Sequence, residues 1–355
     1  MDPIGVMLVE DSLTVRRFLE HLIDGDPRLR VVASVDSGER ALECLERSAP
    51  DVLSVDITLP GMDGFEVVRR VMERRPTPVV VCSSSVRREE LAVSMNALRA
   101  GALTVVEKPA GTASPDFERL ARELCTQLAI MSQVRVVRRR PARPDPPSEV
   151  PRTEGRRSPA PRGAVPALRA IGLVASTGGP PVLVDLLGRL GSPAVPILLV
   201  QHIAPPFHDG FVRWLDDQLP LRVGTATAGP LPRDGVHVAP PERHLTVTSG
   251  RLELSDEPPL LHQRPSGTLL LRSLAEGLGG CAAGVVLTGM GEDGADGLLA
   301  LRRAGAPTFA QDRDTCAVYG MPFAAAERGA AASVLSPAGI ASALRRLAAP
   351  QGEDG

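Results

Sequence analysis

Short apolar runs alternate with stretches of helical periodicity through the first third of the chain. Five runs have the length of buried strands and lie at residues 6–9, 31–35, 52–55, 79–82 and 103–106. Between the first two runs, Val15, Leu19 and Leu22 fall on one face of a helix. Strands that alternate with helices predict parallel strands joined by crossovers, and therefore a doubly wound α/β sheet.

The same pattern returns in the second half of the chain. Buried-strand candidates lie at residues 171–175, 197–200 and 285–288. Near the end, Ser336 and Pro337 precede apolar residues at helical spacing, which is typical of a capped helix start. This half is therefore also expected to be an α/β domain with a doubly wound parallel sheet.

The stretch between the two halves has a different composition. Residues 131–166 are rich in Pro and Arg and poor in large apolar side chains. Such a stretch cannot bury enough surface to offset its ordering entropy, so we expect an extended linker. Contact of this basic stretch with nucleic acid is an alternative. We predict a first domain at 1–130, a linker at 131–166 and a second domain at 167–350.

Composition narrows the classes of function. The 355 residues carry 40 Lys+Arg against 42 Asp+Glu, and a net charge of −2 gives no support to a nucleic-acid or anionic-membrane partner. No run approaches the roughly 18 apolar residues of a membrane helix, and the N-terminus lacks a signal-peptide pattern. Five widely spaced cysteines favour a reducing compartment over a disulfide framework. We expect a cytoplasmic monomer without membrane insertion.

Acidic side chains follow two predicted strands of the first half. Glu10 and Asp11 come after the first strand, and Asp56 follows the third. The carboxyl ends of parallel strands share one edge of a sheet, where ligands bind. Three carboxylates there repel each other unless a cation lies among them, and Mg²⁺ prefers such oxygen ligands. The alternative is that these residues cap helices. Asp11 or Ser12 could cap the next helix, but this alternative explains the position of Asp56 poorly.

A hydroxyl and an ammonium belong to the same edge. Ser83 follows the fourth predicted strand, and Lys108 follows the fifth. Lys108 is the single lysine of the chain, which suggests that this position needs an ammonium and not a guanidinium, although chance can also leave one lysine. Acids, hydroxyl and ammonium together predict a site for a phosphoryl group and its metal ion.

Residues 4–125 resemble the receiver domain of two-component response regulators. The resemblance is carried by Val9-Glu10-Asp11-Ser12, Asp56 followed by Leu59-Pro60-Gly61-Met62-Asp63-Gly64, Ser83, and Lys108-Pro109. It implies that a sensor histidine kinase phosphorylates Asp56 and that the Lys108–Pro109 bond is cis. It also implies that Mg²⁺ is bound by Glu10, Asp11, Asp56 and the Thr58 carbonyl. Ser83 and Lys108 would contact the phosphoryl group. Receivers usually carry an aromatic residue where this chain has Val105.

In the second half, a serine lies where a predicted strand turns into a helix. Ser176 follows the run at 171–175 and precedes Thr177-Gly178-Gly179-Pro180-Pro181. A strand end beside a helix N-terminus exposes the hydroxyl and places backbone N–H groups near developing negative charge. The same string also fits a phosphate-binding glycine loop or an N-capping serine.

A serine nucleophile needs a base and a group that orients the base. Among six histidines, His202 stands at the end of the strand candidate at 197–200, whereas His208 falls in the loop beyond it. Asp293 lies where a glycine loop turns into a helix, a position that an ordinary N-cap also takes. Strand ends that carry Ser, His and Asp predict a serine-hydrolase site at one edge of the sheet.

Residues 168–348 resemble the catalytic domain of the chemotaxis protein-glutamate methylesterase family, and the order receiver, linker, esterase accounts for the whole chain. The strings are Ala175-Ser176-Thr177-Gly178-Gly179, Gln201-His202, Leu287-Thr288-Gly289-Met290-Gly291-Glu292-Asp293-Gly294, Ala310-Gln311-Asp312 and Val318-Tyr319-Gly320-Met321-Pro322. The resemblance implies Ser176 as nucleophile, His202 as general base, Asp293 as orienting acid and the Met290 amide as oxyanion donor.

The implied function is a phosphorylation-regulated response regulator that acts as an esterase in chemotaxis. It hydrolyses glutamate methyl esters on methyl-accepting chemoreceptors to glutamate and methanol, deamidates receptor glutamines, and needs no cofactor for the ester step. The linker holds the receiver at high effective concentration, so the receiver can cover the edge that carries Ser176 until Asp56 is phosphorylated.

The second half departs from the family pattern in three places. Members usually have glycine at the position of Val174. They usually have Met-Pro after the base, where this chain has Ile203-Ala204-Pro205. They usually have Pro-Ser-Val-Asp at positions 265–268, where this chain has Gly267 and Thr268 in the last two positions. The last change removes an acid near the site. Two alternatives therefore stay open: a phosphorylation-controlled binding module with an inactive esterase domain, and, more distantly, a DNA-binding response regulator.

Overall fold

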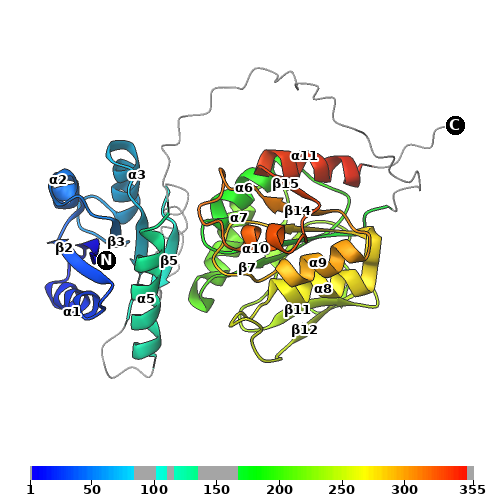
Figure 1. Cartoon of the computed structure of the whole chain (residues 1–355), viewed down its shortest axis with the longest axis horizontal. Helices are drawn as coiled ribbons and strands as arrows, with labels where there is room; N and C mark the ends of the chain where they lie inside the picture. The colour runs from blue at the N-terminus through cyan, green and yellow to red at the C-terminus, as the bar shows by residue number, and fades with distance from the viewer. Residues whose placement is uncertain (1, 84–100, 110–115, 135–166, 350–355) are drawn as a thin grey trace, which may run out of the picture.

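The computed structural model describes residues 2–83, 101–109, 116–134 and 167–349 (Figure 1). These residues form a five-stranded sheet, a seven-stranded sheet and a three-stranded sheet. The two larger sheets are parallel and covered by helices, which confirms the predicted α/β two-domain class. Most of the predicted linker, residues 135–166, lies outside the described residues.

The first sheet has the strand order β2-β1-β3-β4-β5 and is parallel throughout. Its strands are β1 (Ile4–Val9), β2 (Leu29–Val35), β3 (Val52–Asp56), β4 (Val79–Ser83) and β5 (Thr104–Glu107). Its helices are α1 (Leu13–Asp24), α2 (Gly38–Ser48), α3 (Gly64–Arg74) and α5 (Phe117–Met131). All five strands predicted in this half are present, and Ser12 caps α1.

Each face of this sheet is covered by two helices because successive strand residues point to opposite faces. Leu45 of α2 and Val67 of α3 pack on one face. Leu19 of α1 and Leu124 of α5 pack on the other. In Figure 1, α5 and β5 stand on the side of this domain that faces the second one.

The second sheet has the order β15-β14-β13-β6-β7-β10-β8 and is also parallel. Its strands are β6 (Ala170–Ala175), β7 (Ile197–Gln201), β8 (Val223–Thr225), β10 (Val236–Val238), β13 (Ala282–Val286), β14 (Thr308–Gln311) and β15 (Ser333–Leu335). From β6 the chain builds the sheet first in one direction and then in the other. Such a reversal leaves a crevice at the carboxyl ends of the central strands, where ligands bind.

Helices cover both faces of the second sheet. One face carries α6 (Gly179–Leu190), α7 (His208–Gln218) and α11 (Pro337–Ala348), and the other carries α8 (Gly267–Leu278), α9 (Ala295–Arg303) and α10 (Met321–Glu327). Two short 3₁₀ turns, Pro205–Phe207 and Gly279–Cys281, precede α7 and β13. Ser336 caps α11 as predicted, since its hydroxyl accepts the Gly339 N–H.

Two features of the second half differ from the prediction. Strand β13 ends at Val286 rather than at residue 288, because Leu287 and Thr288 stay buried after the ladder ends and their burial continues the apolar pattern. An antiparallel sheet of β11 (His244–Thr248), β12 (Arg251–Ser255) and β9 (Gly229–Pro230) was not predicted. Its hairpin turns at Ser249 and Gly250, both with positive φ, which is typical of a two-residue hairpin loop.

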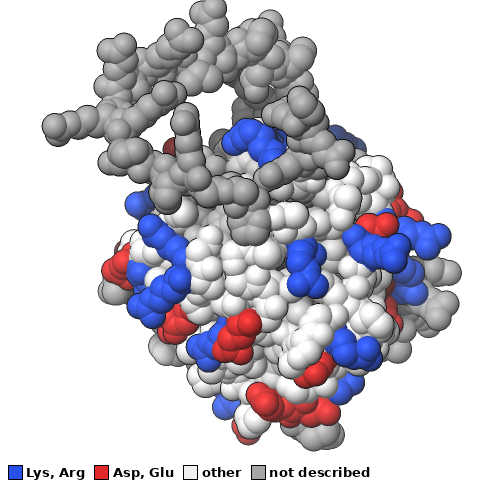
Figure 2. Space-filling view, turned by 90° about the vertical axis from the view of Figure 1, so that its right-hand side faces the viewer, with Lys and Arg blue, Asp and Glu red and all other residues white. Residues whose placement is uncertain are grey.

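The described surface shows mixed charge on the face drawn in Figure 2, where basic and acidic side chains are interspersed among uncharged ones. Among the described helices, none is long and apolar enough to cross a membrane.

Candidate active site and acidic site

The acidic cluster of the first domain forms where the sequence predicted it. Ligand atoms of Glu10, Asp11 and Asp56 all lie within 4.8 Å of one another at the carboxyl ends of β1 and β3. The Lys108 Nζ atom lies 2.7 Å from Glu10 Oε2 and 2.9 Å from Asp56 Oδ2. Glu10 and Asp56 are buried, whereas Asp11 is exposed. Three converging carboxylates open to solvent on one side fit a hard divalent cation that keeps some of its water.

Burial and charge act against each other in this cluster. Burial raises the pKa of Glu10 above its usual value, although the hydrogen bond and charge of Lys108 oppose that rise. Burial alone would lower the pKa of Lys108, but the charges and hydrogen bonds of Asp56 and Glu10 together outweigh it and the pKa is raised. Lys108 therefore remains an ammonium beside the carboxylates.

The remaining predicted residues of this site lie at the same edge. Ser83 ends β4, and its carbonyl accepts the Lys108 N–H at 2.8 Å. The Thr58 N–H donates to Asp56 Oδ1 at 3.3 Å, and the role of its carbonyl stays a prediction. The expected cis bond at Lys108–Pro109 is wrong, because the cis peptide bond among the described residues is Arg264–Pro265. Trans is the lower-energy form even before proline.

In the second domain, the three predicted strand ends meet. Ser176 follows β6, and its N–H donates to the Thr288 carbonyl at 3.0 Å. His202 follows β7, and its N–H donates to the Ala175 carbonyl at 2.9 Å. The His202 Nε2 atom lies 2.9 Å from Asp293 Oδ2. Parallel pairing of β6 with both β7 and β13 brings these ends together, although they are far apart in the sequence.

The Asp293 side chain is held at the start of helix α8, and not at the start of α9, the helix that follows it in the sequence. The N-cap of the following helix α9 is Gly294. The Asp293 carboxylate instead accepts the N–H groups of Gly267 at 2.6 Å and Thr268 at 2.9 Å, together with the Ser266 hydroxyl at 2.8 Å. These groups belong to the N-terminus of α8, where the helix dipole favours negative charge.

The electrostatics of Asp293 follow from these contacts. Burial raises its pKa, but the hydrogen bond and charge of His202 and the hydrogen bonds of Thr268 lower it to about 2. Asp293 is therefore ionised at neutral pH and fixes the orientation of the His202 ring.

Two departures from the family pattern explain each other. A Cβ atom on Gly267 would lie only 2.2 Å from Val174 Cγ1, so the Val174 side chain fills the space that a side chain at 267 would take. Where family members usually have glycine and valine at these two positions, this chain has valine and glycine. At the position of the missing acid, the Thr268 hydroxyl accepts the Gly294 N–H at 2.8 Å.

The sequence reasoning missed Gln201. This buried side chain donates from Nε2 to the carbonyl of Ser176 at 2.9 Å and to that of His202 at 2.9 Å. It therefore ties the turn of the nucleophile to the turn of the base. The available signal was a polar residue at the end of an otherwise apolar strand.

Glycine is required where the Met290 loop meets Ser176. A Cβ atom on Gly289 would lie 2.6 Å from Ser176 Cβ and 2.3 Å from Met321 Sδ. The absence of a side chain lets this loop pack directly on the nucleophile.

The structure separates His202 from the other histidines. His208 was expected in a loop, but it is the first residue of α7. Its buried ring forms a hydrogen bond with the Ala239 carbonyl at 3.1 Å. Buried His244 accepts the Ser266 N–H at 3.1 Å and so supports the start of α8. His262 lies in the wall of the cavity beside His202.

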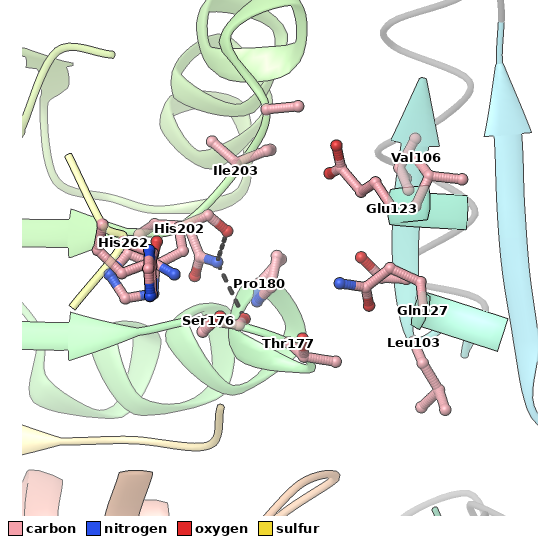
Figure 3. Close-up of a pocket in the computed structure, with 15 residues that line it drawn as sticks. Leu103, Val106, Glu123, Gln127, Ser176, Thr177, Pro180, His202, Ile203 and His262 are labelled. Atoms are coloured by element: carbon pink, nitrogen blue, oxygen red, sulfur yellow. Dashed lines mark hydrogen bonds between the residues drawn. The ribbon is translucent and has the colours of Figure 1, made fainter. Parts of the chain in front are cut away.

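A cavity of about 310 Å³ opens in front of Ser176 (Figure 3). On the side of the second domain it is lined by Ser176, Thr177, Pro180, Gln201, His202, Ile203, Ala204, His262 and Gln263. Its opposite wall comes from the first domain, through Leu103, Thr104, Val105 and Val106 around β5 and through Glu123 and Gln127 on α5. Val105, which replaces the usual aromatic residue, is therefore among the residues that line the cavity of the candidate active site.

The cavity walls hold unsatisfied polar atoms. Gln127 Oε1, Gln201 Oε1 and His202 Nδ1 are buried without a hydrogen-bond partner among the described residues. The residues that carry these three atoms all line the cavity. The Gly178 N–H at the start of α6 donates to the Leu103 carbonyl at 3.2 Å, which joins the two domains beside the cavity.

A receiver-type acidic site on one parallel sheet and a serine, histidine and aspartate cluster on the other define a response regulator with a hydrolase output domain. Comparisons with known proteins agree with this class. The family model "Response regulator receiver domain" matches residues 6–114, and the family model "CheB methylesterase" matches residues 171–344.

Relatives and a solved structure are similar to this chain. The "Protein-glutamate methylesterase/protein-glutamine glutaminase 2" of Paramagnetospirillum magneticum is 47% identical over 353 residues, which cover 97% of each chain. A protein of the same name, numbered 4, from Myxococcus xanthus is 43% identical over 97% of this chain and 96% of its own. The crystal structure of the Thermotoga maritima CheB methylesterase catalytic domain matches 51% of this chain and 99% of that chain, with 32% identity and a TM-score of 0.48. The chain belongs to the protein-glutamate methylesterase/protein-glutamine glutaminase family, as the sequence predicted.

Proposed function

We propose that this protein is a phosphorylation-regulated serine hydrolase that removes methyl esters from glutamate side chains of chemoreceptors and deamidates their glutamines. The observation that carries the proposal is the His202–Asp293 pair, 2.9 Å apart, because His202 lines the same cavity as Ser176, which lies just before α6. The names of the relatives supply the substrate class.

Acyl transfer at this site proceeds in two steps. Ser176 Oγ attacks the γ-carbonyl carbon of the glutamate ester, and His202 accepts the hydroxyl proton. Because Asp293 holds Nε2, the unpaired Nδ1 is the atom that receives it. The protonated His202 then donates to the leaving methanol, and ammonia leaves in the same way from glutamine. Water hydrolyses the acyl-enzyme with His202 again as base, which releases glutamate.

Charge stabilisation comes from backbone groups and from Asp293. The Met290 amide is the expected oxyanion donor, in a loop that packs on Ser176 through Gly289. The N-terminus of α6 adds a favourable dipole. Ionised Asp293 stabilises the imidazolium that forms on His202.

The receiver is the proposed phosphorylation domain, with Asp56 as acceptor of a phosphoryl group from a histidine kinase. Glu10, Asp11, Asp56 and the Thr58 carbonyl would hold Mg²⁺, which when bound neutralises charge on the transferred group. Ser83 and Lys108 would hold phosphoryl oxygens. The converging carboxylates and the Lys108 contacts support this assignment.

Regulation follows from the placement of the receiver. We divide the chain into a receiver at 1–130, a linker at 131–166 and an esterase at 167–350, acting as a cytoplasmic monomer. In this structure, β5 and α5 form one wall of the Ser176 cavity, so the receiver limits access of a protein substrate. Phosphorylated Asp56 adds charge next to Lys108 and shifts the receiver toward a second arrangement.

Methanol release from methylated receptor tests the function. Ser176→Ala should lose activity by a factor on the order of 10⁶, while Ser342→Ala on α11 is a matched control that should not. A phosphodonor should activate the intact chain but not Asp56→Asn. If Ser176→Ala kept more than a few per cent of wild-type activity, Ser176 would not be the nucleophile.

Deletion of residues 1–130 tests the regulatory part separately. Basal esterase activity should rise, because one wall of the cavity is removed. The fluorescence of Trp214, the single tryptophan of the chain, reports whether the remaining domain is folded. A folded truncated chain that is no faster than the unphosphorylated whole chain would show that the receiver does not act by occlusion.

A further inference from the structure

Some of the large apolar side chains that stay exposed lie near the candidate active site. Among the described residues there are five: Leu13, Leu261, Met290, Phe323 and Val334. Leu261 precedes His262, which lines the cavity, and Met290 belongs to the loop that packs on Ser176. Met290 is 48% exposed and Phe323 is 49% exposed. Phe323 lies on α10, a helix that the proposed chemistry does not use.

Phe323 is tied to the active site through the segment before it. The N–H of Met321, the first residue of α10, donates to the Gly289 carbonyl at 2.9 Å. Tyr319 pairs with Gly289 through an isolated parallel bridge, and its ring meets that of Phe323 edge-on at 6.0 Å. Met290, Tyr319 and Phe323 therefore form one surface beside Ser176, which we call the apolar rim.

The described part of the receiver packs on the neighbouring part of this segment. Ala317 and Val318 pack against the receiver core, whereas Met290 and Phe323 remain about half exposed. Next to the rim, Arg328 at the end of α10 contacts Glu292 and lies 2.7 Å from Asp296. The rim is thus an apolar surface beside an ion-pair cluster, and Met290 and Phe323 are not buried by the receiver residues that the structure describes.

The occupant of the rim follows from the chemistry at Ser176 and rests on the proposed function. A glutamyl side chain is short, so when its ester reaches Ser176 the polypeptide that carries it must lie over the loops around the cavity. Methionine and aromatic side chains are enriched where such partners bind, and exposed apolar patches mark binding surfaces. We propose that the apolar rim docks the substrate protein through apolar side chains close to the modified glutamate, one or two turns away if that segment is helical.

Kinetics of the intact chain with saturating phosphodonor test this docking. Phe323→Ser should raise the KM for methylated receptor about tenfold, which corresponds to about 1.4 kcal/mol, and leave kcat unchanged. Hydrolysis of a dipeptide-sized glutamate γ-methyl ester, which cannot reach the rim, should not change, and this also shows that the variant is folded. Phe323→Trp keeps an aromatic surface and should bind receptor normally. Val334→Ser is the matched control, because Val334 is similarly exposed but lies on β15.

Other results overturn the inference in distinguishable ways. An unchanged KM for receptor would show that the rim does not bind substrate. Equal loss on receptor and small ester would show that Phe323 acts through the catalytic loop instead. A wild-type dimer that Phe323→Ser converts to a monomer would make a second copy of the chain the occupant. A wild-type chain that hydrolyses neither substrate would refute the proposed function itself.

Discussion

Exchange of Val174 and Gly267 is the sharpest prediction about packing at the active site. Val174 lies on the central strand β6 and is fully buried. A Cβ atom on Gly267 would lie 2.2 Å, 2.6 Å and 2.9 Å from three side-chain atoms of Val174. The last of these is Val174 Cβ, which no rotamer change can move. We expect that each single substitution is harmful and that the double exchange Val174→Gly/Gly267→Val restores the packing.

The size of each effect can be worked from these contacts. Val174→Gly removes a buried valine, worth about 1.5–3 kcal/mol, and places glycine in a strand, which costs about 0.5–1 kcal/mol more. Gly267→Val overpacks a rigid contact, at about 3 kcal/mol or more. The double exchange keeps the volume and should cost about 1 kcal/mol. The coupling free energy between the two sites is therefore about 4 kcal/mol or more in the stabilising direction.

Urea unfolding followed by Trp214 fluorescence measures these free energies, since this single tryptophan lies on α7 of the second domain. Activity gives an independent measurement. The Gly267 N–H bonds to Asp293 at 2.6 Å, so Gly267→Val alone should also lower kcat, and the double exchange should recover it. Destabilisation of the double variant by the full sum of the single variants would refute the idea that the two departures compensate each other.

Three further predictions concern single side chains. His202→Ala should lose nearly as much kcat as Ser176→Ala. His208→Ala should keep its kcat but lower the free energy of unfolding in urea by about 1–3 kcal/mol. A larger loss of kcat in His208→Ala than in His202→Ala would exclude His202 as the base. Gln201→Met should lower kcat about 10- to 100-fold with little change in KM, because the turns of nucleophile and base lose their link, and an unchanged kcat would contradict that role. Asp293, with its pKa lowered to about 2, stabilises the folded state fully above pH ~4 and loses that contribution as the pH falls toward about 2. The difference in unfolding free energy between wild type and Asp293→Asn should therefore shrink by about 2 kcal/mol over that range, and a constant difference would contradict the lowered pKa.

Local pattern was sufficient for much of the fold. The five strands of the first sheet and the helix at Ser336 were predicted because burial in a parallel sheet demands apolar runs, and because helix starts have side-chain caps. The small antiparallel sheet was missed: β9 has only two residues, whereas β11 and β12 have five each and were still not identified. The end of β13 was misplaced because burial continues beyond the hydrogen-bonded ladder.

The sequence by itself determined the class of the protein and the strand ends that carry Asp56, Ser176 and His202, because the carboxyl ends of parallel strands meet at one edge whatever the details of packing. Only the tertiary structure decided which partners those side chains have. The Asp293 side chain bonds to the start of α8 and not to that of α9. Gln201 links the turns that carry Ser176 and His202. The receiver forms one wall of the Ser176 cavity. These contacts join segments far apart in the chain. Periodicity reports only which way a side chain points from its own element, so it cannot specify the atoms that meet it there.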